Sequence, residues 1–419
     1  MFFLRCAVIT SIASLCLCLA CADDGEKNDA AGDTDTDTDT DTDTDTDTDT
    51  DTDTDTDTDT DTGIEVAEPE APWFQCFDGD EPEGTTIVTA HNQASQYWVS
   101  GGDDFRKVDA EAQFPESGSW KRIYLKVNLD CVSGGGCDPY DRSAAIALVE
   151  NVGGEEKPIE LARHMTPFGV GMCFIADVTH FASLLKGTKT IRSFIDTWVG
   201  PAVGWSVTTR FIFYSGGSNS DYAQEVIPIW NNNAEDRLTN VGNPSAPVEA
   251  EYPSQTITIP ADASKVLLRT LYTGHGQGNL NNCAEFCSQW HTIGIGDNNI
   301  QSEPWREGCD ENPVDNQLGT WEYPRTGWCP GALVVPELTD ITTYVTPGQD
   351  ATFTYAFTDT SGNPYVNSCR PCEEGDTHCG DNNQCDGCAF NSNPGNCDYD
   401  WSMHSAPYIR VSAQLFVFK

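Results

Sequence analysis

The stretch Asn282-Cys-Ala-Glu-Phe-Cys-Ser-Gln-Trp-His-Thr-Ile-Gly-Ile-Gly296 joins a candidate functional group to a pattern that predicts β structure. From His291 onward the residues alternate in type, which places every second side chain on one face of a strand. Glu285 lies between Cys283 and Cys287, which are four residues apart. A disulfide closing so short a loop contributes only about 2 kcal/mol, so we interpret it mainly as a device that orients Glu285. Two alternatives remain open: a surface turn with a solvated glutamate, and a zinc site formed by Cys283, Cys287 and His291.

Segments with the same alternation recur along the chain, and long helical periodicity is absent. The predicted strands are 123–129, 144–149, 190–198, 206–213, 224–230, 255–259, 265–271, 290–295, 332–335, 350–357 and 408–418, with one helical turn at 178–185. Many short strands separated by Gly, Pro and Asn predict an all-β fold built from sandwiches or jelly rolls. The glycine- and serine-rich segment 215–220 suggests a link between two β domains, 71–216 and 217–419.

The first 21 residues predict export. Arg5 is followed by an apolar run that ends in Ala20-Cys21, as in a secretory signal peptide. Cys21 after a small residue resembles a lipoprotein box, so we expect lipidation of Cys21 and attachment to the outer membrane or cell surface. The alternative is simple cleavage and secretion. The run is shorter than the ~20 residues that a spanning helix needs.

Residues 22–70 predict a disordered acidic linker, because Asp33 to Thr62 is an unbroken Asp-Thr alternation with nothing apolar to bury. We interpret it as a solvated spacer. The formal net charge of the whole chain is −44, and no basic patch interrupts the acidic body. Such a chain repels nucleic acid and anionic membrane surfaces, so we expect neither as a partner; contact with a membrane would come only through the lipid anchor.

Cysteine usage agrees with export. Fourteen of the 18 cysteines follow the leader, an even number in a chain sent to an oxidising compartment, which favours disulfides over zinc ligation. Six of them lie in 369–397 among Asp, Asn and Gly. We expect a disulfide-stapled insertion in the second domain there, with a bound calcium ion as an alternative.

Four separate motifs carry polar residues suited to one site. They are Cys137-Asp-Pro-Tyr-Asp-Arg142 after a glycine loop that starts at Cys131, Asp196-Thr-Trp198, the Glu285 loop, and Asn312-Pro-Val-Asp-Asn-Gln317 running on to Arg325-Thr-Gly-Trp-Cys-Pro-Gly331. Each is weak alone. In this order and within this cysteine framework, they resemble the peptide-N-glycosidase F family over residues 116–336.

The resemblance implies two antiparallel jelly rolls lying side by side, with the active site between them. It also implies hydrolysis of the amide that joins Asn to the first N-acetylglucosamine of an N-linked glycan, which releases the glycan and leaves Asp. N-linked glycoproteins or glycopeptides are then the expected partners, and we expect a monomer. A glycan-binding or adhesive protein without turnover on the same fold is the alternative.

The resemblance assigns the principal catalytic aspartate to Asp141 and its neighbouring arginine to Arg142. It assigns the essential glutamate to Glu285 and a supporting arginine to Arg325. Asp196 stands where the family has a second supporting glutamate, one methylene longer. Chemically, we expect Asp141 to activate water, Glu285 to bind the sugar–amide linkage, and Arg325 to orient carboxylates or stabilise an oxyanion.

Three aromatic positions complete the expected substrate-binding set. The sugar-stacking tryptophan is retained as Trp198, another cleft aromatic is replaced by His275, and the tryptophan beside the loop glutamate is replaced by Phe286. The resemblance also implies the disulfides Cys131–Cys137, Cys283–Cys287 and Cys309–Cys329, and elimination leaves Cys76 to pair with Cys173. No cofactor and no metal is expected. A copper site is disfavoured because the seven histidines are scattered.

Overall fold

The computed structural model describes residues 68–76, 84–132, 136–231, 233–234, 236–241, 248–276, 283–364 and 407–419. The expected signal peptide with Cys21, the Asp-Thr linker up to residue 67 and the insertion 369–397 lie outside these residues. Within the described part of the chain, no helix is long and apolar enough to cross a membrane.

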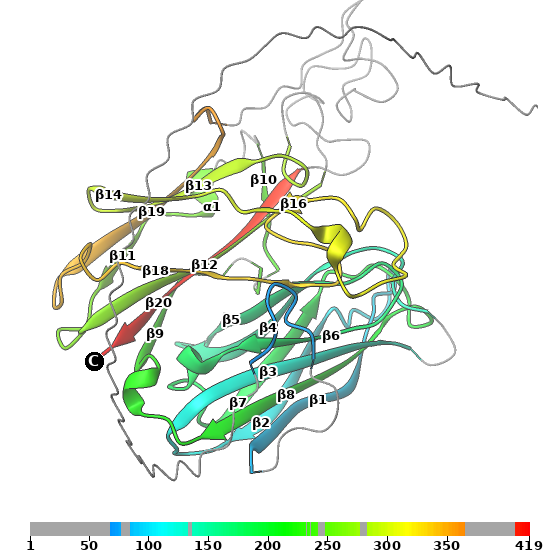
Figure 1. The fold of residues 1–419 in the computed structure, drawn as a ribbon, viewed down its shortest axis with the longest axis horizontal. Coiled ribbons are helices and arrows are strands. Elements are labelled where there is room, and N and C mark those ends of the chain that lie inside the picture. The colour runs from blue at the N-terminus through cyan, green and yellow to red at the C-terminus, as the bar shows by residue number, and fades with distance from the viewer. Residues whose placement is uncertain are drawn as a thin grey trace, which may run out of the picture. The chain divides into compact units, whose positions relative to one another are not determined.

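The first eight strands form two antiparallel sheets (Figure 1). One sheet has the order β1 (Thr86–Gln96), β8 (Trp205–Ser215), β3 (Trp120–Cys131), β6 (Met172–Asp177). The other has the order β5 (Glu155–Met165), β4 (Ser143–Val152), β7 (Gly187–Ile195), β2 (Lys107–Phe114), and the later strand β17 (Leu333–Val334) extends it beside β5. Apart from the β4–β5 hairpin, successive strands alternate between the two sheets, as in a jelly roll.

The second half of the chain forms a second pair of antiparallel sheets. One has the order β10 (Thr239–Asn240), β20 (Tyr408–Phe418), β12 (Lys265–His275), β18 (Glu337–Asp340), and β9 (Glu225–Asn231) also pairs with β20. The other has the order β11 (Gln255–Thr258), β19 (Asp350–Asp359), β13 (Gln289–Ile295), β14 (Asn298–Ser302). A two-stranded ribbon joins β15 (Trp305–Arg306) to β16 (Arg325–Thr326). The all-β prediction is therefore confirmed.

Helical segments are few and short in the described residues. They are α1 (Val248–Glu251), η1 (Thr179–Phe181), η2 (Asn219–Asp221) and η3 (Cys309–Glu311). The helical turn expected at 178–185 is present as η1. The Asp177 carboxylate accepts a hydrogen bond from the backbone N–H of Thr179 at 2.8 Å, which satisfies one of the free donors at this terminus.

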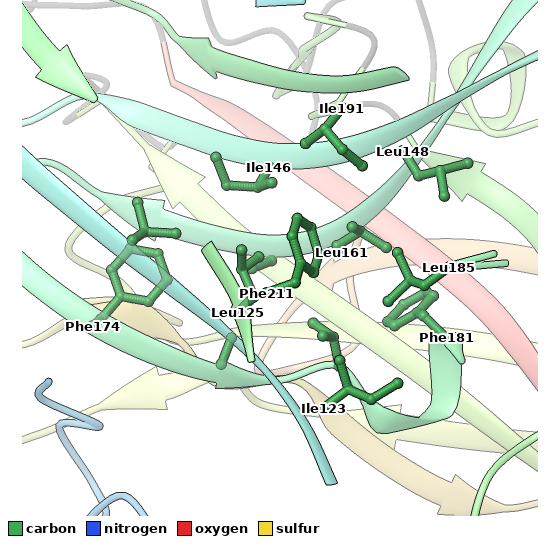
Figure 2. Packing of buried hydrophobic residues seen from close by; sticks show 14 of the residues in the cluster. Ile123, Leu125, Ile146, Leu148, Leu161, Phe174, Phe181, Leu185, Ile191 and Phe211 are labelled. Carbon is green, nitrogen blue, oxygen red and sulfur yellow. The ribbon is translucent and has the colours of Figure 1, made fainter. Parts of the chain in front are cut away.

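Apolar side chains from both sheets fill the first jelly roll. Ile146 and Leu148 point inward from β4, Leu125 from β3 and Phe211 from β8, and each is 0% exposed (Figure 2). Their alternation along the strands is the period-2 pattern that the sequence shows. The second jelly roll has its own buried cluster, centred on β12, β13, β19 and β20.

Strand β5 was not predicted, because its residues do not alternate between apolar and polar. The strand is buried on both faces, and its buried residues include Glu160, Arg163 and His164. The reason is a polar junction with the second jelly roll. Arg163 donates to both carboxylate oxygens of Glu160 (3.0 and 2.8 Å) and to the backbone oxygen of Arg410 on β20 (2.8 Å).

Further hydrogen bonds complete this junction. The Arg269 guanidinium on β12 donates to the backbone oxygen of Leu161 at 3.0 Å, and the Gln414 amide on β20 donates to that of Glu160 at 3.0 Å. Asn233 donates to the Glu160 carboxylate at 2.7 Å, and Ser412 also donates to it. Buried charges are tolerated when they are paired and hydrogen-bonded in this way.

Replacing Arg163 by Met should strongly destabilise the protein, because it leaves Glu160 as an unpaired carboxylate in a dry junction. We expect a loss of about 3–5 kcal/mol in the free energy of unfolding, measured by denaturant titration. The control is Lys157→Met, which breaks an exposed pair with Glu155 and should change stability by about 0.5 kcal/mol or less. Equal effects of the two variants would contradict the importance of the junction.

Candidate active site

Two of the predicted aspartates lie side by side because neighbouring strands carry them. Asp141 lies two residues before β4, and Asp196 directly follows β7. These strands pair antiparallel, with Ala144 opposite Ile195. The backbone N–H of Asp196 donates to the Ser143 oxygen at 3.0 Å, which continues the pairing beyond the strands.

A third aspartate, Asp138, was not singled out from the sequence, although it lies in the same motif. Its side chain is 0% exposed and accepts hydrogen bonds from Arg142 Nε (2.8 Å), Thr197 Oγ1 (2.7 Å) and the Tyr140 backbone N–H (3.1 Å). Arg142 therefore bonds to Asp138, whereas we had interpreted it as the partner of Asp141. Asp138 ties the loop of Asp141 to the segment that holds Asp196, through Thr197.

Glu285 is held by the short loop that the sequence highlighted. Cys283 and Cys287 form a disulfide, which removes both from the zinc alternative. The Glu285 carboxylate accepts a hydrogen bond from the backbone N–H of Gly276 at 3.0 Å, just beyond the end of β12. A Cβ at Gly274 would collide with the backbone oxygen of Ala284, so this glycine lets the loop lie directly on β12.

The remaining described disulfides are Cys76–Cys173, Cys131–Cys137 and Cys309–Cys329. All four are pairs that the sequence comparison or elimination suggested. In the Cys131–Cys137 disulfide, Cys137 directly precedes Asp138 in sequence. In the Cys309–Cys329 disulfide, Cys329 directly follows Trp328. Three of the four therefore brace segments that carry site residues.

Arg325 makes the principal ion pair of the site. It is 0% exposed, and its Nε donates to Glu285 Oε1 at 2.9 Å. Its other two nitrogens donate to the backbone oxygens of Tyr323 and Thr320, each at 2.7 Å. All three nitrogens are therefore committed to the protein, which favours the expected role of orienting a carboxylate over that of binding an oxyanion.

Burial and mutual repulsion set the charges of the two principal carboxyls. Burial raises the pKa of Asp141 to about 7, and the negative charge of Glu285 is the second largest cause of this rise. The positive charges of Arg325 and Arg142 act in the opposite direction. Burial also raises the pKa of Glu285 above its usual value, opposed by the Arg325 guanidinium and the Gly276 N–H. Asp141 is thus a carboxyl that exchanges its proton near neutral pH, as general acid–base catalysis requires.

His275 was expected to contact substrate, and the structure places its ring in the interior, 5% exposed. The ring stacks between Trp328 (5.2 Å, 27°) and Tyr408 (4.9 Å, 18°). Burial holds its pKa well below the usual value, and the charges of Arg410, Arg163 and Arg325 act in the same direction. His275 is consequently a neutral aromatic ring that packs beneath the site.

Asp196 is held by two arginines that the sequence analysis missed. Arg410 on β20 donates to Asp196 Oδ2 at 2.7 Å, and Arg106 Nη1 lies 3.6 Å from Asp196 Oδ1. The signal for Arg410 is present in its strand, where Arg410, Ser412 and Gln414 form a polar alternation in an otherwise apolar run. Nothing local to the sequence of Arg106 indicated its role.

Trp198 is an exposed indole at the rim of the site, with 48% of its surface accessible. The Arg106 guanidinium lies over the ring at 4.3 Å, and Trp98 contacts it edge-on at 5.0 Å. Phe286 follows Glu285 in the loop, and the Arg325 guanidinium lies over its ring at 4.9 Å. The described residues contain no cluster of three or more side chains suited to a metal ion.

Comparison with known proteins shows which family the chain is similar to. A sequence profile of the family described as "Peptide-N-glycosidase F, C terminal" matches residues 246–371. The peptide-N(4)-(N-acetyl-beta-D-glucosaminyl)asparagine amidase F of Elizabethkingia miricola is 30% identical over 235 residues, which are 53% of this chain and 63% of that protein. Over these residues the chain is similar to the peptide-N-glycosidase F family. The match thus spans somewhat less than two thirds of that relative's length.

Solved structures of the family share the fold. PNGase F, a glycosylasparaginase from Flavobacterium meningosepticum, superposes with a TM-score of 0.62 at 22% identity, covering 80% of this chain and 96% of that one. PNGF-II superposes with a TM-score of 0.57 at 14% identity, covering 80% of this chain and 65% of that one. At these identities the likeness concerns the fold alone.

The Glu285→Gln variant should lower the pKa of Asp141 below about 7, because it removes the negative charge that helps to raise it. Carbon-13 NMR of labelled aspartate carboxyls, assigned through Asp141→Asn, measures the titration. The control Glu303→Gln removes an exposed carboxylate elsewhere and should leave the midpoint in place. An unchanged midpoint in Glu285→Gln would show that the two carboxyls do not interact.

Proposed function

We propose that this protein is an amidase that hydrolyses the bond between Asn and the first N-acetylglucosamine of N-linked glycans, releasing the glycan and leaving Asp. The observation that carries the proposal is the convergence of Asp141 and Glu285, two partly buried carboxyls in unlike surroundings. Glu285 is clamped by Arg325 and a backbone N–H, whereas Asp141 titrates near neutral pH. In such a pair, the carboxyl that titrates near neutral pH can accept and return a proton while the other holds the substrate.

In the proposed reaction, water attacks the amide carbonyl carbon while Asp141 accepts a proton from it. The tetrahedral intermediate then loses its C–N bond, and the proton passes from Asp141 to the departing glycosylamine nitrogen. Glu285 accepts a hydrogen bond from the amide N–H and so fixes the linkage over Asp141. No net proton remains on the protein, so Asp141 is ready for another turnover.

Asp196 and Trp198 complete the proposed substrate site. Asp196 is held by Arg410 and Arg106, and presents its carboxylate as an acceptor for sugar hydroxyls. Trp198 offers an exposed ring for stacking on a sugar. The disulfides suit an oxidising compartment, so we propose that the protein is exported. We also propose that it carries a lipid anchor on Cys21 and that it is a monomer.

The direct test is deglycosylation in oxygen-18 water. The oxidised protein is incubated with an Asn-glycosylated peptide, and mass spectrometry follows heavy-oxygen Asp at the former glycosylated Asn. We expect conversion by the wild type and a loss of at least about 100-fold in Asp141→Asn. The matched control Asp297→Asn, in the exposed turn between β13 and β14, should convert normally.

No conversion by the wild type across high-mannose, complex and core-fucosylated glycopeptides would overturn the amidase. Calorimetric binding of the same glycopeptides would then identify a glycan-binding protein without turnover. The shortened carboxylate Asp196 would be the first residue to lengthen, as Asp196→Glu, in an attempt to recover activity.

The pH dependence of the reaction should report Asp141. Because Asp141 must be ionised to accept a proton from water, kcat/KM should fall about tenfold per pH unit below about 7. Initial rates between pH 5 and 9 measure this limb, with Asp297→Asn as the reference for general effects of pH. A limb with its midpoint near pH 4 would assign the base to a carboxyl in an ordinary environment and exclude Asp141.

A further inference from the structure

Amide hydrolysis builds negative charge on the carbonyl oxygen, and this site needs a donor for it. The groups around the proposed reaction centre are mainly acceptors, namely the carboxylates of Asp141, Glu285 and Asp196. A preorganised donor at the developing oxyanion contributes strongly to catalysis in such reactions. The following inference rests on the proposed amidase function.

Most nitrogens of the charged donors in the site are already engaged. All three nitrogens of Arg325 donate to Glu285 or to backbone oxygens. Arg410 is buried and directs Nη2 to Asp196 and Nη1 to Asn233. The Gly276 N–H is taken by Glu285. Arg142 directs Nε and Nη2 to Asp138, which leaves its third nitrogen without an assigned acceptor. Arg410 Nε also has no hydrogen-bond partner among the described residues, but this atom is buried.

Tyr408 lies between the two halves of the site. It is the first residue of β20 and pairs with His275, whose neighbour Gly276 binds Glu285. Two residues further on the same face of β20, Arg410 binds Asp196. The Tyr408 ring is partly buried, stacks on His275 at 4.9 Å and 18°, and lies 5.6 Å from the Arg410 guanidinium.

The Tyr408 hydroxyl is a neutral group that can donate a hydrogen bond to substrate. It has no hydrogen-bond partner among the residues that the structure describes, although its ring is fixed on one face by His275. Burial is the largest cause that raises the pKa of Tyr408. The positive charge of Arg410 lowers this pKa, whereas the negative charges of Asp196, Glu285 and Asp141 raise it further. The hydroxyl therefore lies within the field of all three carboxylates and stays protonated.

We propose that Tyr408 is a further catalytic residue, whose hydroxyl donates a hydrogen bond to the carbonyl oxygen of the scissile amide as that oxygen becomes negative. Tyr408 keeps its proton throughout. The water proton passes to Asp141 and then to the leaving nitrogen, so the bond from Tyr408 strengthens in the intermediate and weakens again as the new Asp carboxyl forms.

The Tyr408→Phe variant tests this proposal cleanly, because it removes the hydroxyl and keeps the ring in its stack. We expect kcat for a glycopeptide to fall about 100-fold, as when one oxyanion donor is removed. KM should stay within about threefold, because the interaction forms mainly in the transition state. The matched control is Tyr344→Phe, a half-exposed tyrosine remote from these contacts, which should behave as wild type.

Thermal unfolding of the same variants checks the fold. Tyr408→Phe should unfold at the wild-type temperature, whereas Tyr408→Leu, which also removes the ring from His275, should unfold earlier. An unchanged kcat in Tyr408→Phe would overturn the proposal. A raised KM with unchanged kcat would also overturn it, because the hydroxyl would then contact the bound substrate only.

These outcomes separate the two proposals. Turnover by the wild type with an unaffected Tyr408→Phe variant rejects the role of Tyr408 and leaves the amidase intact. A wild type without turnover in oxygen-18 water rejects both.

Discussion

One continuous stack of side chains joins Glu285 to Asp196, two of the three carboxylates of the proposed site. Neighbouring groups in it lie 4.9 to 5.6 Å apart. Its members, in order, are Phe286, Arg325, Trp328, His275, Tyr408 and Arg410. The arginine toward one end holds Glu285, and the arginine at the other end holds Asp196. Because each cation lies against an aromatic face, the stack fixes both guanidinium groups in a region that water does not reach.

This stack makes the site a property of both jelly rolls together. Glu285, Arg325 and Arg410 belong to the second half of the chain, whereas Asp141 and Asp196 are carried by β4 and β7 of the first. The polar junction around Glu160 and Arg163 anchors β5 to β12 and β20, the two strands that end or begin at the site. A shift of about 1 Å between the rolls would therefore misplace the carboxylates enough to lower the rate substantially.

The sequence was informative where chemistry is encoded locally. The alternation along β3, β4, β8 and β12 predicted strands, and the spacing of Cys283, Glu285 and Cys287 drew attention to a loop that the fold uses to hold a carboxylate. The sequence did not predict those segments of one jelly roll that are buried by contact with the other jelly roll. Strand β5 lacks alternation because both of its faces are covered, and its charged residues resemble those of a surface segment until their partners on β12 and β20 are known.

The same limit explains the residues that were missed or placed differently. Arg142 is adjacent to Asp141 in sequence, but the turn directs it to Asp138, and only the three-dimensional path of the loop decides between them. His275 was expected to contact substrate, but burial and the nearby charges of Arg410, Arg163 and Arg325 keep its ring neutral, so it acts as an aromatic in the stack. Asp196 was expected from its own motif, but the arginine that holds it, Arg410, reaches it from the opposite roll. His275 lies within the stack and Asp196 is bound at its end, so the position of each depends on side chains that are distant in sequence.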